Sequence, residues 1–165
     1  GGPQAGMIVG KKEYIAKIKK HPMTRALRID KFTAGALELT FEEYLSEERA
    51  IKNIPVLRML TRTTYDIAES ADRLAAMLKG ANADISVEEC ESQVGGGSMP
   101  LARLASRAVT IKPRSISTAA FEERLRRLPL PIVGRVYDDR VALDVRTIDE
   151  ELFGAVAEGV FKALE

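Results

Sequence analysis

The sequence has few of the residues that usually reveal a protein's compartment or chemistry. It contains one cysteine, one histidine and no tryptophan. A single cysteine cannot form an internal disulfide, which favours a reducing compartment. No apolar run approaches the roughly 20 residues that span a bilayer, and the N-terminal GGPQAGMIVG lacks the regions of a signal peptide. We therefore expect a cytoplasmic protein with no membrane partner.

The chain also lacks an excess of charge of either sign. Lysine and arginine number 25 against 24 aspartate and glutamate, so the formal net charge is +1. Such a balance gives no general affinity for nucleic acid, and any binding of anions must be local. The 45% hydrophobic and 30% charged content is typical of a soluble globular protein. A length of 165 residues allows one domain, or one and part of another.

The first residues resemble the interior of a longer protein. GGPQAGMIVGKK opens on a glycine–proline turn that leads into the strand-like AGMIVG and then into a helix. We interpret the chain as a fragment.

The first half of the sequence predicts four helices. They are residues 11–20, a short helix carrying Thr24 to Arg28, a long helix over about 31–45, and a short helix from Pro55. A polar connector, SEERAIKN, separates the long helix from the last one. Asp30 is the expected N-cap of the long helix. A domain boundary is expected between residues 53 and 54.

The second half alternates helices and strands. Thr63 and Asp66 resemble a capping box, behind which Ile67, Ala71, Leu74, Ala75 and Leu78 form one apolar face ending at Gly80. Further elements are expected in this order: strands ADISVEECESQV and SRAVTIKP, a helix over about 118–128, a hairpin in PIVGRVYDDRVALDVR, and a helix over about 149–164 that places Leu152, Val156 and Val160 in line. This order predicts an α+β domain whose helices cover one face of an antiparallel sheet.

The hairpin is the clearest of these patterns. If Asp138 and Asp139 form a two-residue turn, three apolar pairs share one face: Val136 with Val141, Gly134 with Leu143, and Ile132 with Val145. Polar side chains then share the other face: Arg135, Tyr137, Arg140 and Asp144.

One candidate site lies in the basic stretch KKHPMTRALRIDK, residues 19–31. Arg25 and Arg28 are three positions apart, so on a helix both guanidinium groups can point at one spot. Two like charges repel there unless an anion lies between them, and guanidinium groups suit phosphate oxygens. The spacing alone favours a solvated basic face, because runs of charge are usually just solvated.

A second candidate is the loop QVGGGSMP, in particular Gly95, Gly96, Gly97 and Ser98. Consecutive glycines allow the backbone to approach a ligand, but the loop lacks a Walker ending, and a flexible connection between strands remains open. His21 and Cys90 are assigned no chemistry. One histidine and one cysteine do not make a metal site, and we predict none.

Several long stretches together resemble a known family. The run GGPQAGMIVGKKEYIAKIKKHPMTRALRIDK, and after it IPVLRMLTR, SQVGGGSMP and PLPIVGRVYDDRVALDVRT, are similar to the C-terminal part of bacterial selenocysteine synthases, the L-seryl-tRNA(Sec) selenium transferases. The likeness covers essentially the whole chain.

The resemblance implies a fold-type-I enzyme dependent on pyridoxal 5'-phosphate. The lysine that binds this cofactor would lie upstream of Gly1, so that the fragment alone is expected to be inactive. Residues 1–53 would end the large cofactor-binding domain, and residues 54–165 would form the small C-terminal α+β domain. The family also implies a decameric homo-oligomer and an N-terminal tRNA-binding domain.

The implied reaction converts seryl-tRNA(Sec) to selenocysteyl-tRNA(Sec) through a cofactor aldimine and a dehydroalanyl intermediate, with selenophosphate as the selenium donor. Arg25 and Arg28, in the TRALR motif, would bind the selenophosphate anion, and the glycine loop would lie near the active-site mouth. Two alternatives stay open. One is a related pyridoxal phosphate lyase acting on a phosphorylated amino compound. In the other, the small domain serves mainly in assembly or tRNA docking through Arg135, Tyr137 and Arg140.

Overall fold

The structure, a computed structural model, describes residues 1–95, 99 and 101–165. The chain divides into two units, Gly1–Thr61 and Arg62–Glu165. This division lies a few residues after the boundary expected between residues 53 and 54. The assignment of the two parts to a large and a small domain stays a prediction.

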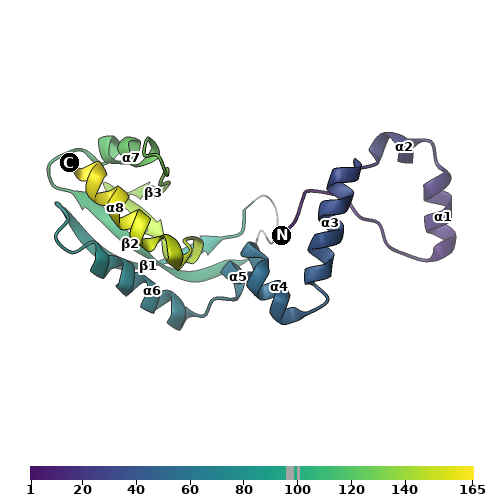
Figure 1. Ribbon diagram of the computed structural model, residues 1–165, viewed down its shortest axis with the longest axis horizontal. Helices are drawn as coiled ribbons and strands as arrows, with labels where there is room; N and C mark the ends of the chain where they lie inside the picture. Colours follow the sequence, from purple (N-terminus) through teal and green to yellow (C-terminus); the bar gives the residue numbers. More distant parts are fainter. Residues whose placement is uncertain (96–98, 100) are drawn as a thin grey trace. The chain divides into compact units, whose positions relative to one another are not determined.

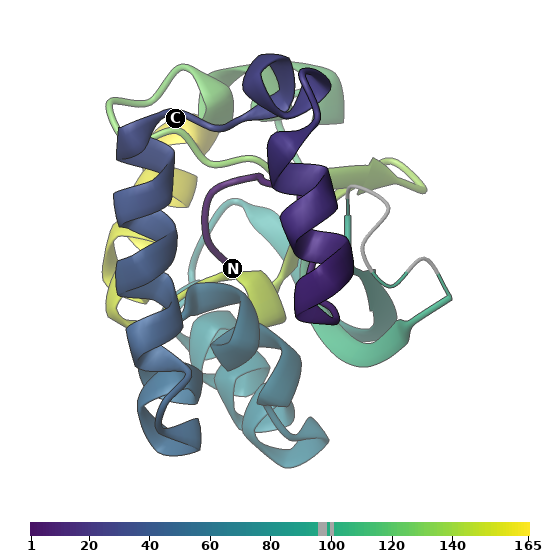
Figure 2. The same ribbon diagram turned by 90° about the vertical axis from the view of Figure 1, so that its right-hand side faces the viewer.

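The Gly1–Thr61 unit is built of helices only. They are α1 (Lys12–Lys20), α2 (Met23–Leu27), α3 (Lys31–Glu43), α4 (Glu47–Asn53) and α5 (Pro55–Thr61). Figures 1 and 2 show α1 and α3 as separate rods that the chain joins through α2. The predicted cap is confirmed, because Asp30 Oδ1 accepts hydrogen bonds from the amides of Phe32 at 2.7 Å and Thr33 at 3.0 Å.

Two expectations for this unit are wrong. AGMIVG is extended but forms no strand, because the strands of the described chain all belong to the sheet of the other unit. An isolated extended segment has no neighbour to satisfy its backbone groups. The polar stretch SEERAIKN forms helix α4 instead of a connector. Ser46 caps it by accepting a hydrogen bond from the Arg49 amide at 3.4 Å, and Glu47 and Glu48 favour its N-terminus.

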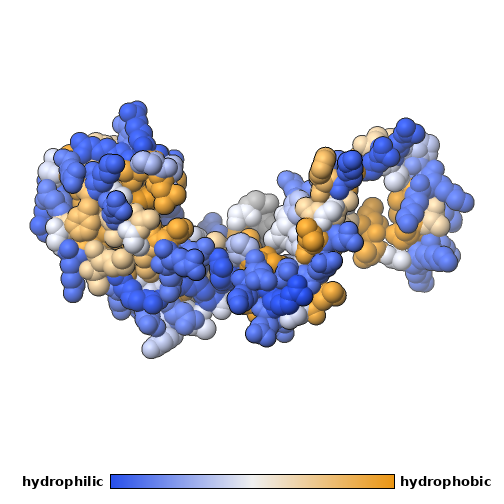
Figure 3. All heavy atoms as spheres, in the orientation of Figure 1, coloured by the Kyte–Doolittle hydropathy of each residue, from blue (hydrophilic) through white to orange (hydrophobic). Residues whose placement is uncertain are grey.

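The Gly1–Thr61 unit buries few apolar side chains. Ala50 and Ile54 are buried, whereas Val9 is 93% exposed and Phe32 is 80% exposed. Orange, apolar atoms are visible at the surface over α3 in Figure 3. This unit therefore has no hydrophobic core of its own comparable to that of Arg62–Glu165.

The Arg62–Glu165 unit has the predicted order of elements (Figure 1). They are α6 (Thr64–Met77), β1 (Ala83–Gln93), β2 (Arg103–Pro113), α7 (Thr118–Arg126), β3 (Arg135–Tyr137), β4 (Arg140–Asp144), the short 3-10 turns η1 (Val145–Thr147) and η2 (Glu150–Leu152), and α8 (Phe153–Leu164). The strands form one antiparallel sheet in the order β1-β2-β4-β3. The expected α+β class is confirmed.

Alternation along the strands determines which face of the sheet is covered. Val87 pairs with Val109, and Val109 pairs in turn with Leu143, so these side chains share one face. They belong to a core that includes Leu74 of α6, Phe121 of α7 and further side chains of α8. The three helices thus pack on this face, and the opposite face carries polar residues.

Local signals at the helix ends are also confirmed. Thr63 and Asp66 form a full capping box at the start of α6. The alignment expected for the last helix is wrong at one position, since Leu152 is 44% exposed and Phe153 is buried instead. Leu152 lies in η2, whose tighter winding rotates it away from the apolar face of α8.

The hairpin turn is confirmed, but its first strand is shorter than expected. Asp138 and Asp139 have φ values of 47° and 56°, which match a type I′ turn, and Val136 pairs with Val141. Strand β3 begins only at Arg135, so the expected pairs of Gly134 and Ile132 lie outside the ladder. Because β3 is an edge strand, Val136 is 54% exposed while its partner is buried.

Gly134 lies too close to strand β4 to carry a side chain without a clash. A Cβ at this position would be 2.5 Å from Val141 Cγ1 and 3.0 Å from the Ala142 carbonyl oxygen. We expect Gly134→Ala to lower the free energy of unfolding by about 1–3 kcal/mol, because the β-branched neighbour and the backbone cannot easily move. Urea denaturation measures this loss.

The matched control is Gly154→Ala in α8, where an added Cβ meets no described atom within 4 Å. This change should raise stability by roughly 0.5–1 kcal/mol through helix propensity. Equal stabilities of the two variants would contradict the close packing of Gly134.

Candidate anion-binding site

A basic hollow lies where α1 ends and α2 begins. Its volume is about 480 Å³, and its lining consists of Lys19, Lys20, His21, Pro22, Thr24, Arg25 and Arg28. The chain turns here because His21 leaves the helical conformation at the end of α1 and Pro22 starts α2. We call this space the basic hollow.

The structure brings the two predicted arginines to the same hollow. Arg25 lies in α2, and Arg28 is the residue directly after this helix, with φ −68° and ψ 140°. Its φ is still helical and its ψ is extended, so the chain leaves the helical path only after Arg28. The predicted spacing of three positions on one helical turn therefore stays compatible with the structure.

The basic hollow is lined by cations without any carboxylate. Four lining side chains are lysine or arginine, and none of its lining residues is aspartate or glutamate. In the described parts of the chain, neither Arg25 nor Arg28 forms an ion pair. Like charges that share one space repel, and an anion between them lowers that repulsion. The arrangement is therefore suited to an anion.

Lys19, Lys20 and His21 belong to the basic stretch identified in the sequence, but only Arg25 and Arg28 were predicted to bind the anion. The lysines and His21 precede Pro22 and belong to the end of α1, so helical periodicity does not relate them to the arginines. Pro22 is the signal in the sequence that could have indicated them. A proline interrupts a helix, so the end of one helix and the start of the next lie close together there.

The structure offers less support for the other candidate sites of the sequence. Gly95 is exposed, and a Cβ there would meet no described atom within 4 Å, so close packing does not require glycine at this position. Gly96, Gly97 and Ser98 lie outside the described residues, and the role expected for this loop stays a prediction. Within the described chain, no group of three or more histidine, cysteine, aspartate or glutamate side chains could hold a metal ion.

The uncovered face of the sheet carries two carboxylates, each held by several donors. Around Glu88, Arg140 Nη1 lies at 2.5 Å, and the hydroxyls of Thr110, Ser86 and Tyr137 donate at 3.1–3.2 Å. Burial raises the pKa of the Glu88 carboxyl, but the hydrogen bonds and the Arg140 charge outweigh it, and the pKa lies below its usual value. The Arg140 charge is thereby neutralised.

The second carboxylate is Asp144. It accepts hydrogen bonds from Ser92 at 2.5 Å, Ser106 at 2.6 Å and Arg135 at 3.2 Å. Burial, and then the Asp144 charge, raise the pKa of the Cys90 thiol, which favours an inert protonated sulfur. With Arg135 and Arg140 both paired to acids, the hairpin face offers little free positive charge for docking tRNA.

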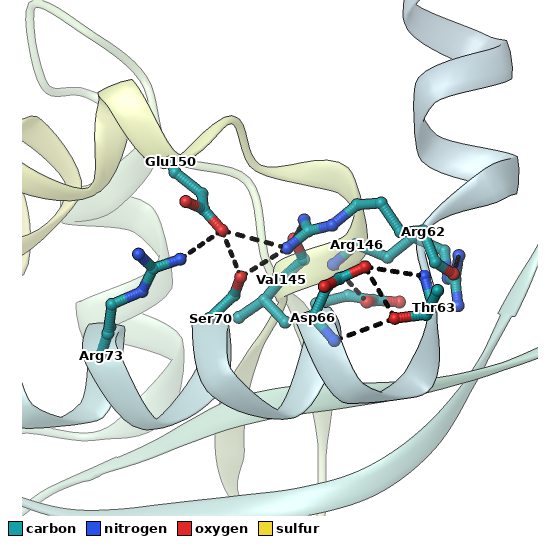
Figure 4. Close-up of polar contacts among 9 residues, drawn as sticks. Arg62, Thr63, Asp66, Ser70, Arg73, Val145, Arg146 and Glu150 are labelled. Carbon is teal, nitrogen blue, oxygen red and sulfur yellow. Dashed lines mark hydrogen bonds and ion pairs between the residues drawn. The ribbon is translucent and has the colours of Figure 1, made fainter. Parts of the chain in front are cut away.

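A third polar cluster ties α6 to the segment between β4 and α8 (Figure 4). Arg62 donates to the Val145 carbonyl oxygen at 2.7 Å and to Ser70 Oγ at 2.5 Å. Glu150 accepts a short hydrogen bond from the Ser70 hydroxyl and pairs with Arg73 at 2.5 Å. The Ser70 hydrogen bond and the two arginine charges lower the pKa of the Glu150 carboxyl below its usual value of 4.5. We call this cluster the Arg62 clasp, and its contacts between α6 and the segment before α8 indicate a structural role.

Comparison with known proteins decides the family. Residues 1–149 match the family of L-seryl-tRNA selenium transferases (SelA). The chain belongs to this family. It is 46% identical over 162 residues to the L-seryl-tRNA(Sec) selenium transferase of Alkaliphilus metalliredigens, covering 97% of this chain and 35% of that protein. The enzyme of the same name from Clostridium perfringens is 47% identical over 167 residues, covering 100% of this chain and 35% of that protein.

The resemblance inferred from the sequence is thus confirmed. The chain spans about a third of the length of these selenium transferases, which agrees with a C-terminal fragment. In the described part of this family member, no helix has the length and apolar character needed to cross a membrane.

The Arg62 clasp gives the chain a pH-dependent contribution to stability. The folded pKa of Glu150 is below the unfolded value near 4.5, so its contribution is complete above that pH and is lost as the pH falls through the folded pKa. We expect Glu150→Gln to be less stable than wild type at pH 7. The difference should shrink below about pH 4.5. Urea unfolding between pH 3 and pH 7 measures it.

The matched control for the Arg62 clasp is Glu151→Gln, the exposed neighbour outside the cluster. That variant should follow wild type across the whole pH range. A Glu150→Gln penalty that is the same at pH 3 and pH 7 would show that the carboxylate charge does not stabilise the clasp.

Proposed function

We propose that this chain is the C-terminal part of an enzyme that converts seryl-tRNA(Sec) to selenocysteyl-tRNA(Sec), and that the basic hollow holds its selenium donor, selenophosphate. Family membership supports the reaction, since the relatives are named L-seryl-tRNA(Sec) selenium transferases. The observation that carries the role of the hollow is the convergence of Arg25 and Arg28 on a space without a carboxylate.

Selenophosphate is a small anion with several charged oxygens around phosphorus. Arg25 and Arg28 present planar guanidinium groups, each able to donate two parallel hydrogen bonds to such oxygens. Lys19 and Lys20 add charge without a fixed geometry. In this proposal the arginines orient the donor so that selenium faces the acceptor carbon, while the lysines raise the local concentration of anions.

Pyridoxal 5'-phosphate is the cofactor that the family resemblance implies for the whole enzyme, where it would serve as an electron sink. The lysines of this chain do not fit its attachment. A lysine that forms a Schiff base is usually activated by desolvation. Here every lysine is exposed except Lys112, which is half-buried and pairs with Asp139 at 3.5 Å. The attachment point would then belong to another segment of the parent protein.

The same proposal covers the domains and the assembly. Residues 1–53 would complete the large cofactor-binding domain, residues 54–165 would form the small domain, and the parent would be a homo-oligomer, a decamer as the family resemblance implies. The scarcity of buried apolar side chains in Gly1–Thr61 supports a segment that belongs to a larger body. The isolated fragment would be inactive.

The test uses the full-length parent protein with Arg25→Ala or Arg28→Ala. We expect each change to lower selenium transfer about 100-fold, because a charged donor aimed at the reacting anion is lost. Binding of pyridoxal phosphate, followed by its absorbance, should stay unchanged. Transfer is measured as selenium incorporated into seryl-tRNA(Sec).

The control is Arg49→Ala in the same unit, whose exposed ion pair with Glu43 is expected to matter little. If Arg25→Ala and Arg28→Ala both turn over like wild type, the basic hollow is not the selenophosphate site. Binding of an organic phosphate monoester in place of selenophosphate would favour the alternative, a lyase acting on a phosphorylated amino compound.

A further inference from the structure

His21 lies in the basic hollow, although no sequence pattern assigns it a role. It ends α1, where its amide donates to the Ile18 carbonyl oxygen, and it lines the hollow together with Arg25 and Arg28. The side chain is exposed, so a ligand in the hollow can reach it.

One nitrogen of the His21 ring is already occupied. The amide of Met23, the first residue of α2, donates a hydrogen bond to His21 Nδ1 at 3.2 Å. A ring nitrogen that accepts a hydrogen bond carries no proton, so the neutral imidazole has its proton on Nε2. This contact also restrains the rotation of the ring, leaving Nε2–H as the atom available to a ligand.

The remaining lining groups differ from His21 in kind. The lysines and arginines are charged donors. The Thr24 hydroxyl uses its proton on the Ile18 carbonyl oxygen at 2.6 Å and has none to offer an anion. Among the described lining residues other than lysine and arginine, His21 thus has the free donor, Nε2–H, because its Nδ1 accepts from the Met23 amide.

We propose that His21 Nε2–H donates a hydrogen bond to an oxygen of the anion in the basic hollow and thereby selects oxyanions of the phosphate class. The inference deepens the proposed function and rests on it. The arginines and lysines attract any anion, whereas a single directed donor favours a strong acceptor, such as a charged oxygen, at a fixed place. A bare selenide has no such oxygen, so His21 favours the phosphoryl carrier of selenium. His21 is a positioning residue in this scheme.

Two substitutions distinguish the contribution of His21 Nδ1 from that of His21 Nε2. His21→Asn keeps an acceptor near the Nδ1 position for the Met23 amide but has no donor at the Nε2 position. His21→Gln places an amide N–H near the Nε2 position and loses the contact with Met23. The pair therefore distinguishes a role toward the ligand from a role in starting α2.

The experiment is calorimetric titration of the full-length parent protein with inorganic phosphate and, separately, with iodide as an anion without oxygen. We expect His21→Asn to weaken phosphate binding about tenfold, the loss of one hydrogen bond to a charged group. Iodide binding should not change. His21→Gln should bind phosphate within about threefold of wild type. Thermal melts of each variant verify that it is folded.

Arg25→Ala, titrated in parallel, separates this inference from the proposed function. If that variant loses phosphate affinity while His21→Asn binds like wild type, the role of His21 is overturned and the anion site stands. If both bind phosphate like wild type, the hollow is not the anion site and both proposals fail. Equal losses in His21→Asn and His21→Gln would also overturn the role of Nε2–H.

Discussion

Positive charge without a counterion is the constraint on which the basic hollow depends. Like charges that share one space repel one another, so several cations there disfavour that arrangement. On the sheet, by contrast, Arg140 pairs with Glu88 and Arg135 with Asp144. The net charge of +1 conceals this uneven distribution. Only the fold shows which arginines pair with an acid and which line the basic hollow.

Much of the fold could be predicted because its signals are local. The capping box of Thr63 and Asp66 needs only a carboxylate three residues after the N-cap. The hairpin turn needs only two aspartates, Asp138 and Asp139, between alternating apolar residues. Both signals therefore depend only on neighbours in sequence. The failed strand AGMIVG depends on a pairing partner, which the segment itself cannot specify. Helix α4 was missed for another reason. Its polar composition suggested a connector, although Ser46 and the acidic first turn are a helix start.

The candidate site was predicted less completely than the fold. Spacing identified Arg25 and Arg28 as a pair, and both line the hollow, with Arg28 directly after the last residue of α2. Lys19 and Lys20 reach the same hollow across Pro22, which no periodic pattern relates to the arginines. The tautomer of His21 follows from a contact with the Met23 amide, and a contact of this kind exists only once the turn between the two helices has formed.

The unequal burial of the two units has a calorimetric consequence. The heat-capacity increment of unfolding grows with the apolar surface that becomes hydrated. In Gly1–Thr61, all of which the structure describes, only Ala50 and Ile54 are buried apolar residues, whereas the core of Arg62–Glu165 draws on α6, α7, α8 and the sheet. Most of the increment therefore originates in Arg62–Glu165. The curvature of the stability–temperature profile of this chain reports mainly on that unit.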